Sequence, residues 1–181
     1  MVTLSQMKKG GNTTVKRRET TVFIITAATI AAAYVVCTML LSSVSFGVIQ
    51  LRIAEVMTVL PYFSWAPVWG LFVGCAVSNL LFSFMPLDFA VGSIATLIAA
   101  LLTRALKNHK WLAPLPPVIV NAVMIGGLLT FYTAGGFPTA LLLTNMGIVA
   151  AGQAIVCYGM GLPLLLMVEK RFAKKISPVD L

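Results

Sequence analysis

Apolar residues dominate the chain from about residue 21 to residue 168, and short runs of Pro, Gly, Ser or basic residues divide them into stretches. A helix that crosses a bilayer needs about 20 apolar residues. Prolines near the borders of several stretches suit the first turn of a helix. The pattern therefore predicts an all-α integral membrane protein whose six helices cover residues 21–41, 53–63, 68–84, 88–104, 114–135 and 141–168.

The second stretch is the weak point of this prediction. Residues 53–63 are too few to cross a hydrocarbon core of about 30 Å as a straight helix. We expect this helix either to borrow residues 48–52 or to be sheltered by its neighbours. A four-span alternative, in which the segment is re-entrant, stays open.

The composition excludes an ordinary soluble domain. Of the 181 residues, 59% are hydrophobic and 10% are charged, whereas soluble domains have about 25% charged residues. Too few polar residues remain to cover a water-facing surface, and the chain is too apolar for disorder. The three cysteines lie inside apolar stretches without ligand spacing, so we expect free thiols rather than a metal site.

The charge distribution predicts the topology. Thirteen basic residues stand against five acidic ones, and twelve of the thirteen form three clusters that flank apolar stretches, as the positive-inside rule describes. This placement argues against nucleic-acid binding. The clusters are Lys8, Lys9, Lys16, Arg17 and Arg18; Arg104, Lys107 and Lys110; and Lys170, Arg171, Lys174 and Lys175.

If all three clusters are cytoplasmic, an even number of spans separates each neighbouring pair. Four spans fit between the first and second clusters and two between the second and third. The count predicts a six-transmembrane-helix bundle with cytoplasmic N- and C-termini in the cell membrane. We divide it into a basic tail (1–20), a membrane domain (21–170) and a C-terminal tail (171–181).

Polar side chains inside membrane spans are costly and are therefore candidates for function. In the predicted topology most lie towards the outer side, which suggests one pocket open to the outside. The candidates for binding a ligand are Gln50, Arg52, Glu55, Asn79, Asp88, Asn121, Tyr132 and Gln153.

Each candidate also has a structural interpretation. Arg52 and Glu55 are three residues apart, so they could pair with each other on one helix face. Asp88 could cap the helix that begins there, and the amide side chains could bond between helices as packing contacts.

A row of small residues predicts a close contact between helices. Alanines repeat at spacing four in Ala27 with Ala31 and in Ala28 with Ala32, and such rows let another helix approach closely. The contact could be with a partner protein or internal. We find neither a catalytic arrangement nor a phosphate-binding loop, so we expect no enzyme and no cofactor.

Four segments resemble the QueT family, the queuosine-precursor substrate-binding (S) components of energy-coupling factor (ECF) transporters. They are residues 49–61 (IQLRIAEVMTVLP), 88–102 (DFAVGSIATLIAALL), 112–121 (LAPLPPVIVN) and 155–163 (IVCYGMGLP). The resemblance implies a six-helix bundle with an outward-facing pocket. It also implies a complex with a transmembrane coupling subunit, which docks on Ala27, Ala28, Ala31 and Ala32, and with two cytosolic ATPases.

The implied substrate is a 7-deazaguanine such as queuine, preQ0 or preQ1, captured from outside the cell for ATP-driven uptake. A carboxylate such as Glu55 can accept two adjacent N–H donors of the guanine edge. The family commonly has an acid where this chain has Gln153, so that contact is neutral here. Two alternatives stay open: an S component for another vitamin or nucleobase, and a solitary small secondary transporter or assembly factor.

Overall fold

The structure, a computed structural model, describes residues 4–41, 52–83 and 87–173, with residues 4–16 described by their backbone alone. Within this part of the chain every regular element is helical. The elements are α1 (Leu4–Leu40), the 3₁₀ helix η1 (Ile53–Tyr62), α3 (Ala66–Phe82), α4 (Asp88–Ala105), α5 (Leu115–Ala134), α6 (Thr139–Val156), the π-helical turn η2 (Cys157–Gly161) and α7 (Leu162–Ala173).

The prediction of six helices is confirmed, because α6, η2 and α7 follow one another as a single long helix. Among the described residues, four helices are long and apolar enough to cross a membrane: Arg17–Leu40, Asp88–Ala105, Leu115–Ala134 and Thr139–Arg171. Ile53–Tyr62 and Ala66–Phe82 are shorter. Several long apolar helices are consistent with a multi-pass membrane protein, while the side on which the termini lie stays a prediction.

The short helix η1 lies inside the bundle. A 3₁₀ helix rises about 2 Å per residue, so its 10 residues reach about 20 Å, less than the hydrocarbon thickness of about 30 Å. It contacts α1, α3, α4, α6, η2 and α7. Of the two expectations for the second stretch, shelter by its neighbours is the one that the structure supports, and residues 48–51 lie outside the described part.

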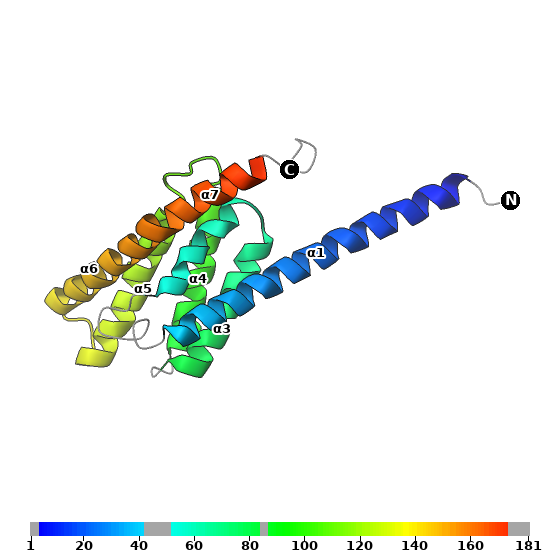
Figure 1. Cartoon of the computed structure of the whole chain (residues 1–181). Coiled ribbons are helices and arrows are strands. Elements are labelled where there is room, and N and C mark those ends of the chain that lie inside the picture. The colour runs from blue at the N-terminus through cyan, green and yellow to red at the C-terminus, as the bar shows by residue number, and fades with distance from the viewer. Residues whose placement is uncertain (1–3, 42–51, 84–86, 174–181) are drawn as a thin grey trace.

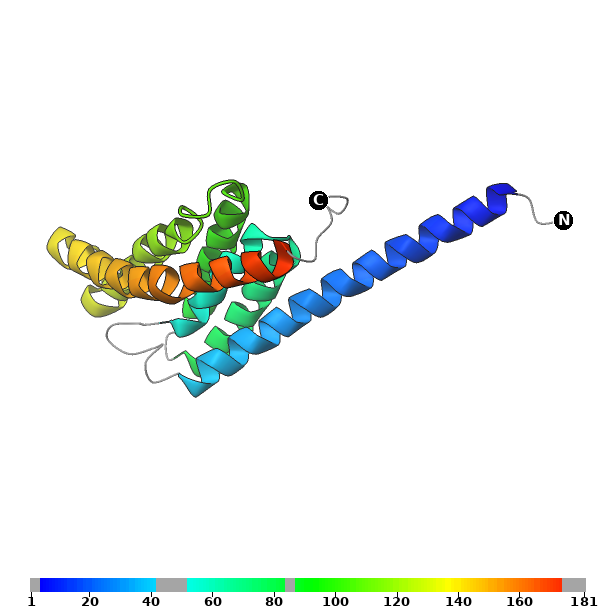
Figure 2. The same ribbon diagram turned by 45° about the horizontal axis from the view of Figure 1, so that its top comes forward.

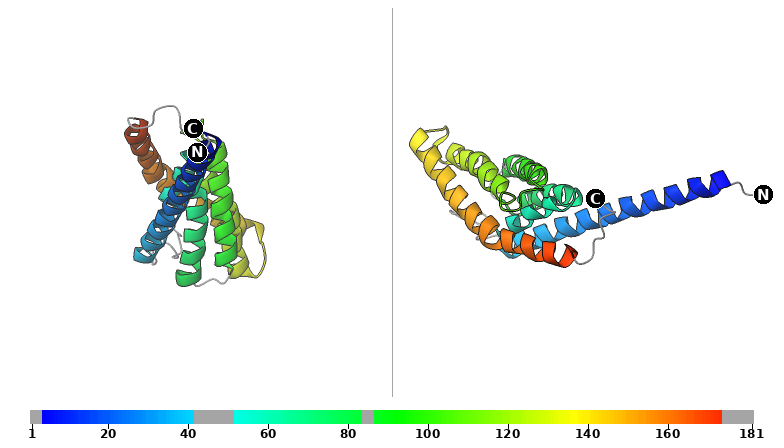
Figure 3. Two further views of the ribbon diagram at one scale, coloured as in Figure 1. Left: turned by 90° about the vertical axis from the view of Figure 1, so that its right-hand side faces the viewer. Right: turned by 90° about the horizontal axis from the view of Figure 1, so that it is seen from above.

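The other helices surround η1 in chain order. α1 packs on α3, α3 on α4, α4 on α5 and α5 on α6. The long α6–α7 helix then runs along the outside of the bundle and returns to η1 (Figure 1; Figure 3, right). Large apolar side chains such as Leu80, Ile119 and Ile155 stay exposed on the outer faces, as expected of surfaces that contact lipid.

The first helix begins earlier than expected. The tail predicted over residues 1–20 is helical from Leu4 on, so α1 starts about 17 residues before the predicted border. Its N-terminal half projects beyond the other helices (Figure 2). The contacts with the α3 glycines are made by residues 27–34, in the C-terminal half of α1.

The basic clusters lie at one end of the bundle. Lys110 Nζ is 3.3 Å from Glu169 Oε2, which joins the loop after α4 to the C-terminal end of α7. Arg104 donates to the carbonyl oxygen of Tyr62 at 3.0 Å and lies over the Trp65 ring. The N-terminal half of α1 points to the same end as the C-terminal end of α7 (Figure 3, left). This arrangement agrees with the charge-parity argument.

Close packing of α1 on α3 depends on two glycines. A Cβ atom at Gly70 would lie 2.6 Å from the Ala27 carbonyl oxygen, and one at Gly74 would lie 2.8 Å from Tyr34 Cβ and 3.0 Å from the Ala31 carbonyl oxygen. These neighbouring atoms belong to the backbone or are fixed to it, so they cannot move away cheaply. The row of small residues therefore serves an internal contact on one side.

We predict that Gly74→Ala destabilises the protein by about 1–3 kcal/mol, because the added methyl group forces α1 and α3 apart. The matched control is Gly127→Ala on α5, where an added Cβ meets nothing within 4 Å and should stabilise by up to about 1 kcal/mol. Thermal unfolding of both variants in detergent checks the difference. Equal melting temperatures for the two variants would contradict the proposed packing.

Candidate functional site

Arg52 precedes η1 and forms a buried ion pair with Asp88. Its Nη2 atom lies 2.8 Å from each carboxylate oxygen of Asp88, the first residue of α4. Both side chains are almost fully buried, with exposures of 5% and 1%. The sequence left open a pair between Arg52 and Glu55 on one helix face, but the carboxylate that Arg52 contacts comes from another helix.

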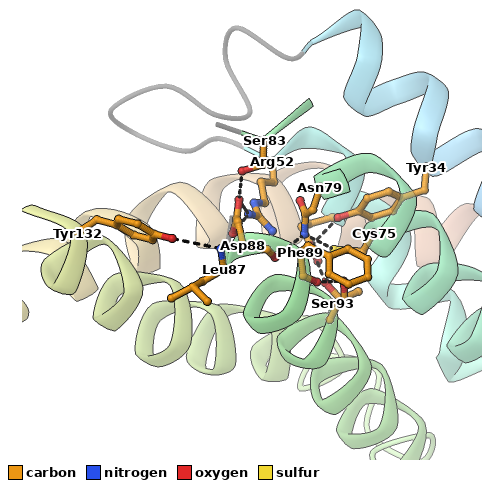
Figure 4. A network of polar contacts seen from close by, with 12 residues as sticks. Tyr34, Arg52, Cys75, Asn79, Ser83, Leu87, Asp88, Phe89, Ser93 and Tyr132 are labelled. Atoms are coloured by element: carbon orange, nitrogen blue, oxygen red, sulfur yellow. Dashed lines mark hydrogen bonds and ion pairs between the residues drawn. The ribbon is translucent and has the colours of Figure 1, made fainter. Parts of the chain in front are cut away.

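Three residues hold Asp88 in place by hydrogen bonds (Figure 4). Besides Arg52, Ser83 Oγ donates to its carboxylate at 2.9 Å, and Asn79 Nδ2 donates to its backbone carbonyl oxygen at 3.0 Å. Leu87 occupies the N-cap position of α4 and Asp88 is the first residue inside the helix, and the Asp88 carboxylate bonds to Arg52 and Ser83. Gly92 leaves the necessary space, because a Cβ there would lie 2.5 Å from Asn79 Nδ2.

Glu55 is the second buried carboxylate and is fully inaccessible to solvent. Its Oε1 atom accepts hydrogen bonds from Tyr34 Oη at 2.9 Å and from Thr96 Oγ1 at 3.3 Å. Its Oε2 atom has no hydrogen-bond partner among the described residues. A buried carboxylate oxygen without a donor is costly, so this atom is available to a ligand that brings donors.

Asn121, on α5, presents a second set of unsatisfied atoms. Its side chain is fully buried beside the Glu55 carboxyl group. Within the described part of the chain, neither its Nδ2 nor its Oδ1 atom makes a hydrogen bond. The Asn121 amide thus lies near enough to stabilise the Glu55 carboxylate, but neither the Asn121 amide nor Glu55 Oε2 has a hydrogen-bond partner at ordinary distance and angle among the described residues.

Gln153 joins this region through a cysteine. Cys157 Sγ lies 3.5 Å from Gln153 Oε1 and 3.8 Å from the Glu55 backbone carbonyl oxygen. Cys157 begins the π-helical turn η2, and such turns often occur at functional sites. In the described residues no group of His, Cys, Asp and Glu could hold a metal ion.

One predicted candidate, Tyr132, lies outside this buried region. Tyr132 is 38% exposed, and its hydroxyl oxygen accepts a hydrogen bond from the Leu87 backbone N–H at 3.1 Å (Figure 4). It therefore supports the turn before Asp88 rather than the buried cluster. Gln50 lies outside the described residues.

The site hence consists of buried polar side chains from six helices, α1, η1, α3, α4, α5 and α6. We refer to them as the polar cluster: Tyr34, Arg52, Glu55, Asn79, Asp88, Thr96, Asn121 and Gln153. Sequence reasoning missed Tyr34 and Thr96. Both were missed because only the packing of the helices shows which hydroxyl groups face Glu55. Arg52, Ser83 and Asp88 meet at the end of α4 opposite Arg104, while Thr96 lies halfway along α4 and Asn121 lies in the first third of α5.

The two alanine rows of α1 face different surroundings. Ala27 and Ala31 lie against the glycines of α3, while Ala28 and Ala32 are exposed. A partner-binding role for these alanines stays a prediction, and only the second row remains accessible for it.

We predict that Asp88→Asn costs about 3–5 kcal/mol of stability, because it leaves the buried Arg52 charge uncompensated. Glu169→Gln breaks an ion pair whose side chains are 36–41% exposed and should cost about 0–1 kcal/mol. Thermal unfolding in detergent compares the two. A similar loss in both variants would show that the Arg52–Asp88 pair is not shielded from water.

Comparisons with known proteins identify the family of the chain. The family model described as QueT transporter matches residues 24–170. The chain is 37% identical over 85 residues to the "Queuosine precursor transporter QueT" of Lactococcus lactis subsp. cremoris (strain MG1363); the alignment covers 43% of this chain and 50% of that protein. The chain thus spans about half the length of this curated relative. No solved structure matches significantly. Since the family model covers most of the chain, the protein belongs to the QueT transporter family.

Proposed function

We propose that this protein is the substrate-binding S component of an ECF-type importer and captures a queuosine precursor from outside the cell. The proposed substrate class is taken from the name of the Lactococcus lactis relative. The coupling subunit and the two ATPases follow from the sequence resemblance. The absence of a phosphate-binding loop from the sequence is consistent with ATP hydrolysis by other chains.

The observation that carries the proposal is the pair of buried residues with unsatisfied atoms, Glu55 and Asn121. Buried polar groups in proteins are nearly always hydrogen-bonded. Unsatisfied groups that lie together on η1 and α5 therefore indicate a place where a polar ligand completes the hydrogen bonding.

The chemistry of a 7-deazaguanine matches these atoms. The guanine edge has two adjacent N–H donors beside a carbonyl oxygen. The Glu55 carboxylate can accept both donors in a charge-assisted contact, while Asn121 Nδ2 can donate to the carbonyl oxygen. A site that matches hydrogen bonds in this way strongly rejects analogues that lack them.

The position of the polar cluster supports capture from outside. Its Arg52–Asp88 part lies at the end of α4 opposite Arg104, and Thr96 lies halfway along that helix. Basic residues concentrate on the cytoplasmic side of membrane proteins, so the cluster extends from the opposite side to the middle of the bundle. Tyr34 connects the cluster to α1, the helix whose exposed residues Ala28 and Ala32 we assign to the coupling subunit. Substrate site and partner surface thus share one helix.

The first test is the substitution Glu55→Gln. It replaces one acceptor oxygen by a donor, so we expect the affinity for queuine or preQ1 to fall about 10- to 100-fold, in line with the loss of a hydrogen bond to a charged group. Calorimetry on the purified protein measures this. Glu169→Gln makes the same chemical change at the basic end and should leave affinity unchanged. Unaltered affinity in Glu55→Gln would remove Glu55 from the site.

The second test concerns the partner surface. In cells that also make the coupling subunit and the ATPases, the double substitution of Ala28 and Ala32 by Leu should abolish uptake of labelled precursor, because the larger side chains prevent close helix approach. Binding by the isolated protein should persist. Ala151→Leu, at an exposed position of α6, is the control and should retain uptake. Loss of binding in the double variant would instead indicate internal packing.

A further inference from the structure

The charges inside the bundle do not balance. Among the described residues, three charged side chains are buried: Arg52, Glu55 and Asp88. The internal segments 42–51 and 84–86, which lie outside the described part, contain no acidic or basic residue. One buried cation therefore faces two buried carboxylates.

Arg52 forms its buried ion pair with Asp88. Both Asp88 oxygens lie 2.8 Å from Arg52 Nη2, and Ser83 adds a further donor. The donors to Glu55 are neutral hydroxyl groups, from Tyr34 and Thr96, and both contact the same oxygen. Arg52 also attracts the Glu55 carboxylate electrostatically, but one cation cannot neutralise two carboxylates, and Glu55 Oε2 has no hydrogen-bond partner at ordinary geometry among the described residues.

We expect the ligand to compensate this excess negative charge. An uncompensated ion in a low-dielectric interior costs several kcal/mol. A neutral base would leave Glu55 either charged without a counter-ion, or protonated and so less able to accept two donors. A base that carries an ammonium group restores neutrality while Glu55 stays a carboxylate.

We propose that the polar cluster selects queuosine precursors that carry a positive charge over neutral precursors with the same ring. The inference rests on the proposed function and deepens it. It assigns Glu55 two roles: Glu55 accepts hydrogen bonds from the guanine edge, and its negative charge attracts the ammonium group from across the ring, because that group is on the opposite side of the base. Asp88 serves to neutralise Arg52.

Two ligands test this directly. Both preQ1 and preQ0 have the 7-deazaguanine ring, but preQ1 carries an aminomethyl group that is charged at neutral pH, and preQ0 carries a neutral nitrile. Calorimetry on the wild-type protein in detergent should give an affinity for preQ1 at least about tenfold higher than for preQ0, since opposite charges separated by the width of the base still attract each other appreciably where they are shielded from water.

Variants then identify the source of the selectivity. Glu55→Gln should reduce the affinity ratio of preQ1 to preQ0 to about one. Glu55→Asp keeps the charge, and we expect it to retain a clear preference for preQ1 even where both affinities fall. Glu169→Gln should leave the ratio at its wild-type value.

The outcomes separate the inference from the proposed function. Equal wild-type affinities, tighter binding of preQ0, or an unchanged ratio in Glu55→Gln would overturn the charge selection alone. If the wild-type protein bound neither ligand, the proposed function would be overturned, and the inference with it. The wild-type comparison needs no variant, so a Glu55 variant that fails to fold does not prevent the test.

Discussion

The ion pair between Arg52 and Asp88 is the contact on which the arrangement of the site depends. It joins the start of η1 to the start of α4 across 36 positions of sequence, in surroundings where either charge alone would be strongly unfavourable. Because it fixes η1 against α4, it also fixes Glu55, three residues further on, opposite Thr96 of α4. The position of the proposed ligand-binding carboxylate therefore follows from the pairing of two other charges.

Small side chains make this polar interior possible. Gly70 and Gly74 allow α1 to approach α3 closely, which brings the Tyr34 hydroxyl group to Glu55. Gly92 performs a similar task inside α4 by leaving space for Asn79 and Arg52. In a membrane, where lipid is as apolar as the protein interior, close packing and hydrogen bonds between helices replace the hydrophobic effect as the source of association.

Much of this architecture could be predicted from the sequence, because its signals are local. Apolar stretches and prolines placed all six helices, and the cost of burying polar groups singled out Arg52, Glu55, Asp88 and Asn121. The partner of Arg52 could not be predicted, because it depends on how α4 approaches η1. Tyr34 was missed because a tyrosine in an apolar span looks the same whether it faces lipid or a buried acid. The 3₁₀ geometry of η1 likewise has no distinct periodic signal.

In the proposed binding mode, Glu55 and Asn121 complete their hydrogen bonding with the guanine edge of a 7-deazaguanine. A ligand-bound structure of this protein, crystallographic or by electron microscopy, tests it most directly. We expect the base inside the polar cluster. Its two N–H donors should lie within hydrogen-bonding distance of the Glu55 carboxylate, and its carbonyl oxygen should accept a hydrogen bond from Asn121. A base bound elsewhere, with Glu55 Oε2 and the Asn121 amide still without partners, would contradict it.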